Sequence, residues 1–137
     1  MLVIDGNHFY TASEPINFKQ QLLYIIACRR AKGGFTVRNS SNAGFVITNE
    51  VDAVNATRLV STDSVFHTVI SQNCLQNSTF GSGVNRVIIN SLVLRNPIVN
   101  GIKFSSRIAQ GAGDIFDGLR VDNVFASYDS DYVNPRN

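Results

Sequence analysis

Short stretches of alternating apolar and polar residues, each followed by an asparagine, recur along the chain. Three stretches have apolar residues at positions one and three and asparagine at position five: Phe35–Asn39, Leu92–Asn96 and Leu119–Asn123. Two more, Val3–Asn7 and Val69–Asn73, fit the same frame with a polar residue at position three. Alternation at period two predicts strands that bury one face.

A second feature repeats after the asparagine. Gly44 follows Asn39 by five residues and Gly101 follows Asn96 by five, and each glycine opens another alternating stretch. Hairpins do not require the same strand, turn and strand in the same order, whereas stacked parallel coils do. The sequence therefore predicts an all-β fold, a short single-stranded right-handed parallel β-helix of about four or five coils.

Asparagine has a physical role at the corner of such a coil. It enters the left-handed backbone region more easily than most other residues, and stacked amides can hydrogen-bond from one coil to the next. The chain holds 15 asparagines among 137 residues, so single matches to the frame carry little weight. The repeated neighbours predict a structural ladder formed by Asn7, Asn39, Asn73, Asn96 and Asn123.

Two segments lie outside this frame. Residues 22–28 are rich in strand-forming side chains, although Ser13 and Pro15 could also begin a helix that includes them. We favour a strand at 22–28, preceded by a polar loop or short helix over 10–21. Residues 1–126 then form one β-helix domain, and residues 127–137 form a polar arm whose Tyr128 and Tyr132 either belong to a frayed end or contact a partner.

Composition limits the classes of partner. A hydrophobic content of 44% suits one core, and a net charge of +2 provides no strong field for nucleic acid or an anionic membrane surface. The apolar run at 22–28 is too short to span a bilayer, and no secretion signal is evident, so we expect synthesis in the cytoplasm. Cys28 and Cys74 lack metal-ligand spacing, and two buried thiols are favoured over a disulfide between them, without a metal or cofactor.

An acidic cluster is the best candidate for enzymatic chemistry. Asp114, Asp117 and Asp122 lie close in sequence to further aspartates and to Arg107 and Arg120. A glycosidase needs two carboxylates a few ångströms apart, but separations of three and five residues place side chains on opposite faces of one strand. We therefore favour surface or turn carboxylates over catalysis.

Arginines and phenylalanines complete the candidate set. Arg38, Arg95 and Arg120 fall between inward positions and should point outward, where they either bind acidic groups of a sugar or partner or keep the sheet face soluble. Seven phenylalanines fit stacked core positions: Phe35, Phe45, Phe66, Phe80, Phe104, Phe116 and Phe125.

The coil pattern and asparagine ladder resemble the pectate-lyase-like parallel β-helix superfamily, which includes polysaccharide lyases, polygalacturonase-type hydrolases and phage tailspikes. The resemblance covers about residues 1–126 and implies a fold rather than an activity. Its enzymes are much longer, and the hydrolases carry grouped aspartates and a Gly-His-Gly-type motif, whereas His8 and His67 stand alone here.

Short β-helices of this kind without enzymatic motifs are most similar to phage virion proteins. The resemblance implies a homotrimer that docks to other virion proteins, such as a major capsid or tail protein, as a capsid cement or decoration protein or a small tail-associated spike. A strand near Met1–Ile4 also leaves an open edge that invites association. The alternative is a glycan-binding or polysaccharide-depolymerising module that acts on a host glycan; outward apolar residues would favour assembly, and grouped aspartates with aromatics would favour sugar chemistry.

Overall fold

The computed structural model describes residues 2–5, 23–26, 30–48, 50–52, 57–59, 61–81, 84–105 and 116–134. The predicted all-β class is confirmed, because every regular element in these ranges is a strand. The strands are β1 (Leu2–Asp5), β2 (Leu23–Ile26), β3 (Lys32–Thr48), β4 (Glu50–Asp52), β5 (Thr57–Leu59), β6 (Ser61–Gly81), β7 (Val84–Arg95), β8 (Asn100–Ser105) and β9 (Phe116–Ser127). The predicted strand at 22–28 is present as β2, whereas the loop or helix expected at 10–21 lies outside the described residues.

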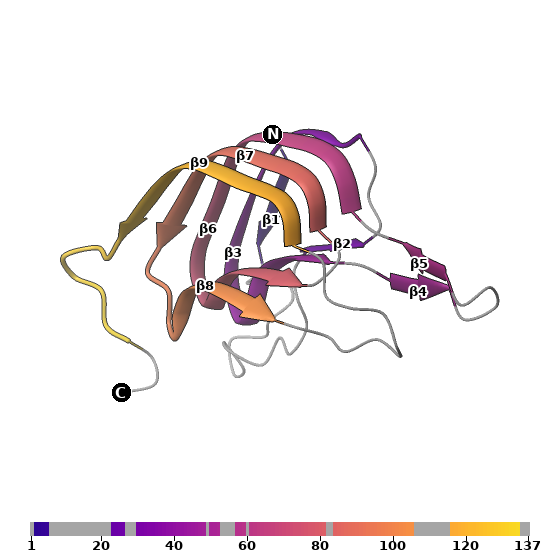
Figure 1. Ribbon diagram of the computed structural model, residues 1–137. Helices are drawn as coiled ribbons and strands as arrows, with labels where there is room; N and C mark the ends of the chain where they lie inside the picture. The colour runs from indigo at the N-terminus through magenta and orange to yellow at the C-terminus, as the bar shows by residue number, and fades with distance from the viewer. Residues whose placement is uncertain are drawn as a thin grey trace.

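Seven of the strands form one parallel sheet. Its main order is β1-β3-β6-β7-β9, with β2 paired to β3 and β8 paired to β6. Strands β4 and β5 form a separate antiparallel pair. Figure 1 shows β1, β3, β6, β7 and β9 side by side, with β8 and β2 at a lower level.

The two longest strands, β3 and β6, fold back on themselves. The backbone takes a left-handed φ of 63° at Asn39 in β3 and of 54° at Asn73 in β6. The rings of Phe35 and Phe45 belong to the same strand, which would hold them roughly 30 Å apart if it were straight. Their centroids are only 5.3 Å apart, so the two halves of β3 face each other.

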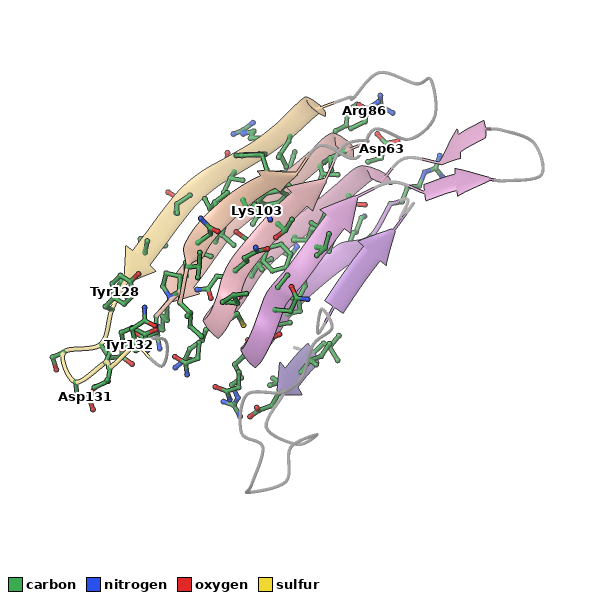
Figure 2. The ribbon with its side chains drawn as sticks, turned by 90° about the horizontal axis from the view of Figure 1, so that it is seen from below. Asp63, Arg86, Lys103, Tyr128, Asp131 and Tyr132 are labelled. Atoms are coloured by element: carbon green, nitrogen blue, oxygen red, sulfur yellow. The ribbon has the colours of Figure 1, made fainter. Side chains whose placement is uncertain are left out.

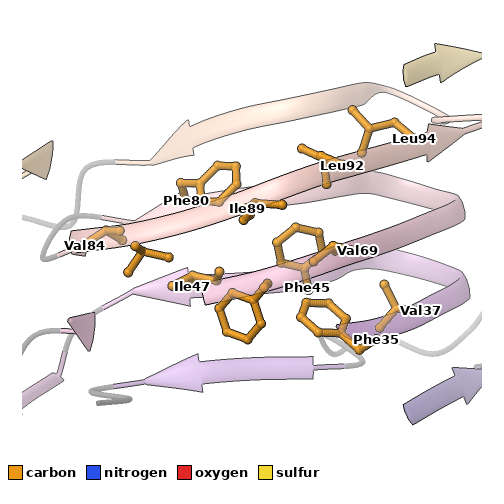
Figure 3. Packing of buried hydrophobic residues seen from close by; sticks show 12 residues of the cluster. Phe35, Val37, Phe45, Ile47, Val69, Phe80, Val84, Ile89, Leu92 and Leu94 are labelled. Carbon is orange, nitrogen blue, oxygen red and sulfur yellow. The ribbon is translucent and has the colours of Figure 1, made fainter. Parts of the chain in front are cut away.

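The core fills the space between these facing halves (Figure 3). Phe45 packs edge to face on Phe35 and on Phe80 of β6, with ring centroids 5.9 Å apart in the second pair. Inward positions of the neighbouring strands complete a fully apolar cluster, which includes Val37, Ile47, Val69, Val84, Val87, Ile89, Leu92 and Leu94.

The five-residue frame is correct for three stretches and displaced for two. Phe35 pairs with Val69, and Val69 pairs with Leu92, as the frame requires. In β1, however, it is Leu2 rather than Val3 that pairs with Phe35. In β9, Val124 pairs with Leu92, and Leu119 pairs with Val87 instead. Alternation at period two fits a strand at several registers, so the local pattern did not determine these two.

The phenylalanine prediction is partly wrong. Phe35, Phe45, Phe66 and Phe80 are buried, but Phe104 in β8 and Phe125 in β9 are 63% and 58% exposed. Both exposed rings lie on strands with a neighbour on one side only in the described sheet. The side chain of Phe116 lies outside the described part of the chain.

Candidate functional site

A row of amides crosses the sheet at the corner where the strands turn. Asn73 donates from Nδ2 to Oδ1 of Asn39 at 3.1 Å, and Asn96 donates from Nδ2 to Oδ1 of Asn73 at 3.0 Å. All three asparagines have a left-handed φ, of 63°, 54° and 48° in chain order. The linked residues are 34 and 23 positions apart, so the amide row joins successive passes of the chain.

Carboxylates occupy both ends of this row. Asp5 Oδ1 accepts from Asn39 Nδ2 at 2.8 Å, and its Oδ2 accepts from Arg38 Nε at 2.7 Å. At the other end, Asp129 Oδ2 accepts from Asn96 Nδ2 at 2.8 Å, and the Asp129 amide donates to Asn96 Oδ1 at 2.8 Å. The amide ladder consists of Asp5, Asn39, Asn73, Asn96 and Asp129.

The structure therefore brings together three of the five asparagines predicted for the ladder. Asn7 lies outside the described residues. Asn123 is elsewhere, because β9 pairs it with Ser91, and its side chain donates to the Asn90 carbonyl at 2.9 Å. The place expected for Asn123 is taken by Asp129, which follows the end of β9.

Asn77 is a structural polar residue that the sequence frame missed. Its side chain is fully buried and donates to the carbonyls of Ser71 at 2.9 Å and Arg95 at 3.0 Å. Its Oδ1 accepts from the Cys74 amide at 3.2 Å, and its own carbonyl accepts from the Ser71 hydroxyl at 2.6 Å. The register places Asn77 level with Gly44 and Gly101, so a full alignment of the three passes would have singled it out.

The three arginines predicted to form one outward row separate into two groups. Arg38 and Arg95 are exposed and lie level with each other, with Gln72 between them in the register. Arg120 is also exposed, but it pairs with Ile88 and forms an ion pair with Asp122. The row of guanidinium groups therefore contains only Arg38 and Arg95, and Arg38 is paired with Asp5.

Beside this row, four apolar side chains and one threonine form a stripe on the outer face of the sheet. Thr36, Ile70 and Val93 each lie between two buried residues, so they point outward and are half-buried. The register continues this position to Val3, which is 53% exposed, and to Phe125, which is 58% exposed. The outer stripe consists of Val3, Thr36, Ile70, Val93 and Phe125, and it spans four strand spacings, about 19 Å.

Of the acidic candidates, Asp122 is the one whose side chain the structure describes. Asp122 is exposed and accepts from Arg120 Nε on the same strand. Asp117 pairs through its backbone with Asn85, and its side chain is outside the described part, as is the whole of Asp114. Among the described residues, no three histidine, cysteine or acidic side chains are grouped as metal ligands.

The C-terminal arm folds back on the chain in its described part, residues 128–134. Tyr128 donates from its hydroxyl to the Pro97 carbonyl at 3.0 Å, and Asn134 donates to the Ile98 carbonyl at 3.1 Å. The rings of Tyr128 and Tyr132 stack with centroids 5.2 Å apart, at the end of β9 in Figure 2. Burial raises the pKa of the Tyr132 hydroxyl, and neighbouring Tyr128 adds to the shift. Tyr128 and Asn134 thus contact the segment that follows β7, and Tyr132 contacts Tyr128.

At the opposite ends of the strands, Arg86 and Asp63 form an exposed ion pair (Figure 2). Arg86 donates from Nε and Nη2 to the two carboxylate oxygens at 2.6 and 3.0 Å. Both residues have a left-handed φ, of 48° and 54°. The ion pair joins β6 to β7 near the start of both strands, and its role there is structural.

No family model, curated protein or solved structure matches this chain. Within the ranges that the structure describes, no helix has the length and apolar character needed to span a bilayer.

Proposed function

We propose that the chain is a short right-handed parallel β-helix that acts as a structural protein and assembles through its outer stripe. In this proposal each coil runs along one half of a long strand, turns at an amide-ladder residue, and returns along the other half. The folding back of β3 at Asn39 and the parallel pairing of residues 34 and 23 positions apart support the winding. The likeness to the pectate-lyase-like superfamily is part of the proposal.

The outer stripe is the observation that carries the assembly function. Ile70 and Val93 are apolar side chains on an outer face, where a sheet in contact with water alone favours polar ones. A contiguous apolar patch with a polar rim is typical of a protein–protein interface. Arg38, Gln72 and Arg95 supply such a rim, since they lie two positions further along the same strands.

We propose a homotrimer in which the outer stripes of three copies pack about a threefold axis. The trimer would serve as a virion part of a phage, either a capsid cement or decoration protein or a small tail-associated spike. It would dock there to a major capsid or tail protein. Detection of peptides of this chain in purified phage particles would test the location.

The solution mass tests the assembly. Light scattering of the purified chain over a concentration series should give about three times the chain mass of 15.0 kDa. The double variant Ile70→Thr with Phe125→Ser keeps strand-compatible residues but removes apolar area from the outer stripe, so it should return the mass to that of one chain. A wild-type chain that stays at 15.0 kDa at every concentration would contradict the proposal.

A matched control separates the outer stripe from apolar exposure in general. Val133 is 80% exposed but lies in the C-terminal arm, away from the stripe. Val133→Ser should leave the trimer mass unchanged. Loss of the trimer in this variant as well would mean that the stripe is not the interface.

A glycan-active module is the alternative function. The described part of the chain supports it less, because Asp122 is exposed and paired with Arg120. Measured depolymerisation of a capsular polysaccharide by the purified chain would nevertheless replace the structural proposal. Asp114 and Asp117 would then be the first residues to substitute.

A further inference from the structure

The described part of the C-terminal arm, residues 128–134, buries little of its own surface. Five of its seven residues are exposed, including Tyr128 at 61% and Val133 at 80%, and Tyr132 and Asn134 are half-buried. Figure 2 shows Tyr128, Asp131 and Tyr132 beyond the end of β9. Because burial of apolar surface is the main favourable term in folding, this arm gains much less stability from it than the strands of the core do.

The segment on which the arm lies is fixed independently of the arm. This dock is residues 96–98, which directly follow β7, and Asn96 and Pro97 are buried. The amides of Ile98 and Val99 donate to carbonyls at the corner of β6, each at 2.9 Å. Asn96 also donates to Asn73 of β6 at 3.0 Å. The dock therefore keeps its place beside β6 whether or not the arm is bound.

Asp129 binds the dock through both its side chain and its backbone. Its Oδ2 accepts from Asn96 Nδ2, and its amide donates to Asn96 Oδ1, both at 2.8 Å. Its carbonyl accepts from the Tyr132 amide at 3.0 Å, which closes a turn within the arm. Tyr128 and Asn134 each add a hydrogen bond to a dock carbonyl. Hydrogen bonds to a charged group are the stronger kind, so the Asp129 carboxylate is the main polar anchor of the arm.

We propose that residues 128–134 form a strap that opens and closes on the dock while the sheet stays folded, and that the Asp129 carboxylate is its latch. Segments with few buried apolar contacts and exposed hydrogen bonds open at a lower free energy than the core. Opening uncovers the acceptor oxygens of Asn96, Pro97 and Ile98 that the arm occupies when it is closed. The strap contains no residue of the outer stripe, so it does not depend on the proposed assembly.

Residue-resolved hydrogen exchange measured by NMR tests the strap. The amides of Asp129 and Tyr132 are hydrogen-bonded when the strap is closed, so their protection factors report its opening. In the wild type these protection factors should be at least about ten times lower than those of the hydrogen-bonded amides of β7. In Asp129→Ala the amides of residues 129 and 132 should lose about a further tenfold, because a hydrogen bond to a charged group is removed, and β7 should be unchanged.

Asp131→Ala is the matched control. Asp131 is exposed in the same arm and is not one of the described arm residues bonded to the dock, so this variant should leave the protection of residues 129 and 132 unchanged. Asp129→Asn should lower the protection by no more than about threefold, since its amide oxygen can still accept from Asn96. If Asp129→Ala does not fold, Tyr128→Phe takes its place, because it removes only the hydroxyl bound to the Pro97 carbonyl and should lower the same protection factors.

Three results would overturn the inference. Arm amides as protected as those of β7 in the wild type would mean that the arm opens only when the sheet unfolds. A loss of protection in β7 as well as in the arm of Asp129→Ala would mean the same. Unchanged protection in Asp129→Ala, or an equal loss in Asp131→Ala, would mean that Asp129 is not the latch. Each comparison is made with β7 in the same sample, so a monomeric wild type would contradict the proposed trimer but leave this test valid.

Discussion

Buried polar side chains at the corner, such as Ser71 and Asn77, are hydrogen-bonded, and burial there changes the acidity of the Cys74 thiol. Cys74 is fully buried beside Ser71 and Asn77, and it forms no disulfide. Burial raises the pKa of its thiol from 9.0 to about 11, against the smaller opposing effect of hydrogen bonds from its surroundings. The sequence prediction of a buried thiol is confirmed for Cys74, while Cys28 is outside the described residues.

This pKa shift makes stability depend on pH in the alkaline range. The unfolded chain loses the thiol proton near pH 9, whereas the folded chain keeps it up to about pH 11, so the folded state binds more protons between these values. The free energy of unfolding should therefore fall as pH rises from 9 to 11, by up to about 3 kcal/mol. Urea unfolding of the wild type and of Cys74→Ala at pH 7, 9 and 10.5 measures it. The free energy of unfolding of the wild type should fall relative to that of Cys74→Ala as the pH rises. A difference that stays constant with pH would contradict the raised pKa of Cys74.

At the scale of the strand, two glycines in equivalent positions meet different surroundings. A Cβ on Gly44 of β3 would lie 2.4 Å from Ser71 Oγ and 2.8 Å from the Asn77 carbonyl oxygen. A Cβ on Gly101 of β8 would meet nothing closer than Leu94 Cδ1 at 3.4 Å. Each glycine opens an alternating stretch five residues after an asparagine. Of the two, Gly44 lies against the packed corner of the neighbouring strand and Gly101 does not.

Gly44→Ala should therefore destabilise the protein much more than Gly101→Ala. We expect a loss of about 3 kcal/mol in the free energy of unfolding for Gly44→Ala, because the buried hydroxyl and carbonyl have to move. Gly101→Ala should stay within about 0.5 kcal/mol of the wild type. Chemical unfolding followed by circular dichroism compares the two, and equal effects would show that the strands do not approach as closely as the geometry requires.

The same strands show how far the sequence predicts this fold. The all-β class, the strand at β2 and the shared level of Phe35, Val69 and Leu92 follow from alternation and from asparagine at the corner. The displaced registers of β1 and β9 do not, because a pattern of period two repeats within each strand and the number of residues between paired strands varies. Asp129 as a ladder residue could not be predicted either, since its place depends on where β9 ends and the chain turns.

At the scale of the whole molecule, the main sheet is held by pairing between distant parts of the chain, so its strands depend on their neighbours. Strand β9 pairs side by side with β7, whose inward residues Val87, Ile89 and Leu92 are fully buried. Strands β4 and β5 pair only with each other among the described residues and stand apart from the seven-stranded sheet. Where parts of a chain contact only their neighbours, stability is approximately a sum over those contacts.

Replacing the β4–β5 pair or strand β9 by a Gly/Ser segment of equal length tests how much each contributes to the stability of the main sheet. Replacement of residues 50–59, which hold β4 and β5, leaves every strand pair of the main sheet in place. We therefore expect the free energy of unfolding to fall by at most about 1 kcal/mol, and the melting temperature to change by less than about 5 °C. Replacement of residues 116–127, which form β9, leaves β7 without its paired neighbour on that side and should remove the cooperative thermal transition. Because the replacement has the same length, it can still span the distance between the flanking strands in both cases. If the variant at residues 50–59 also lost its thermal transition, the β4–β5 pair would be part of the core structure and not separate from the main sheet.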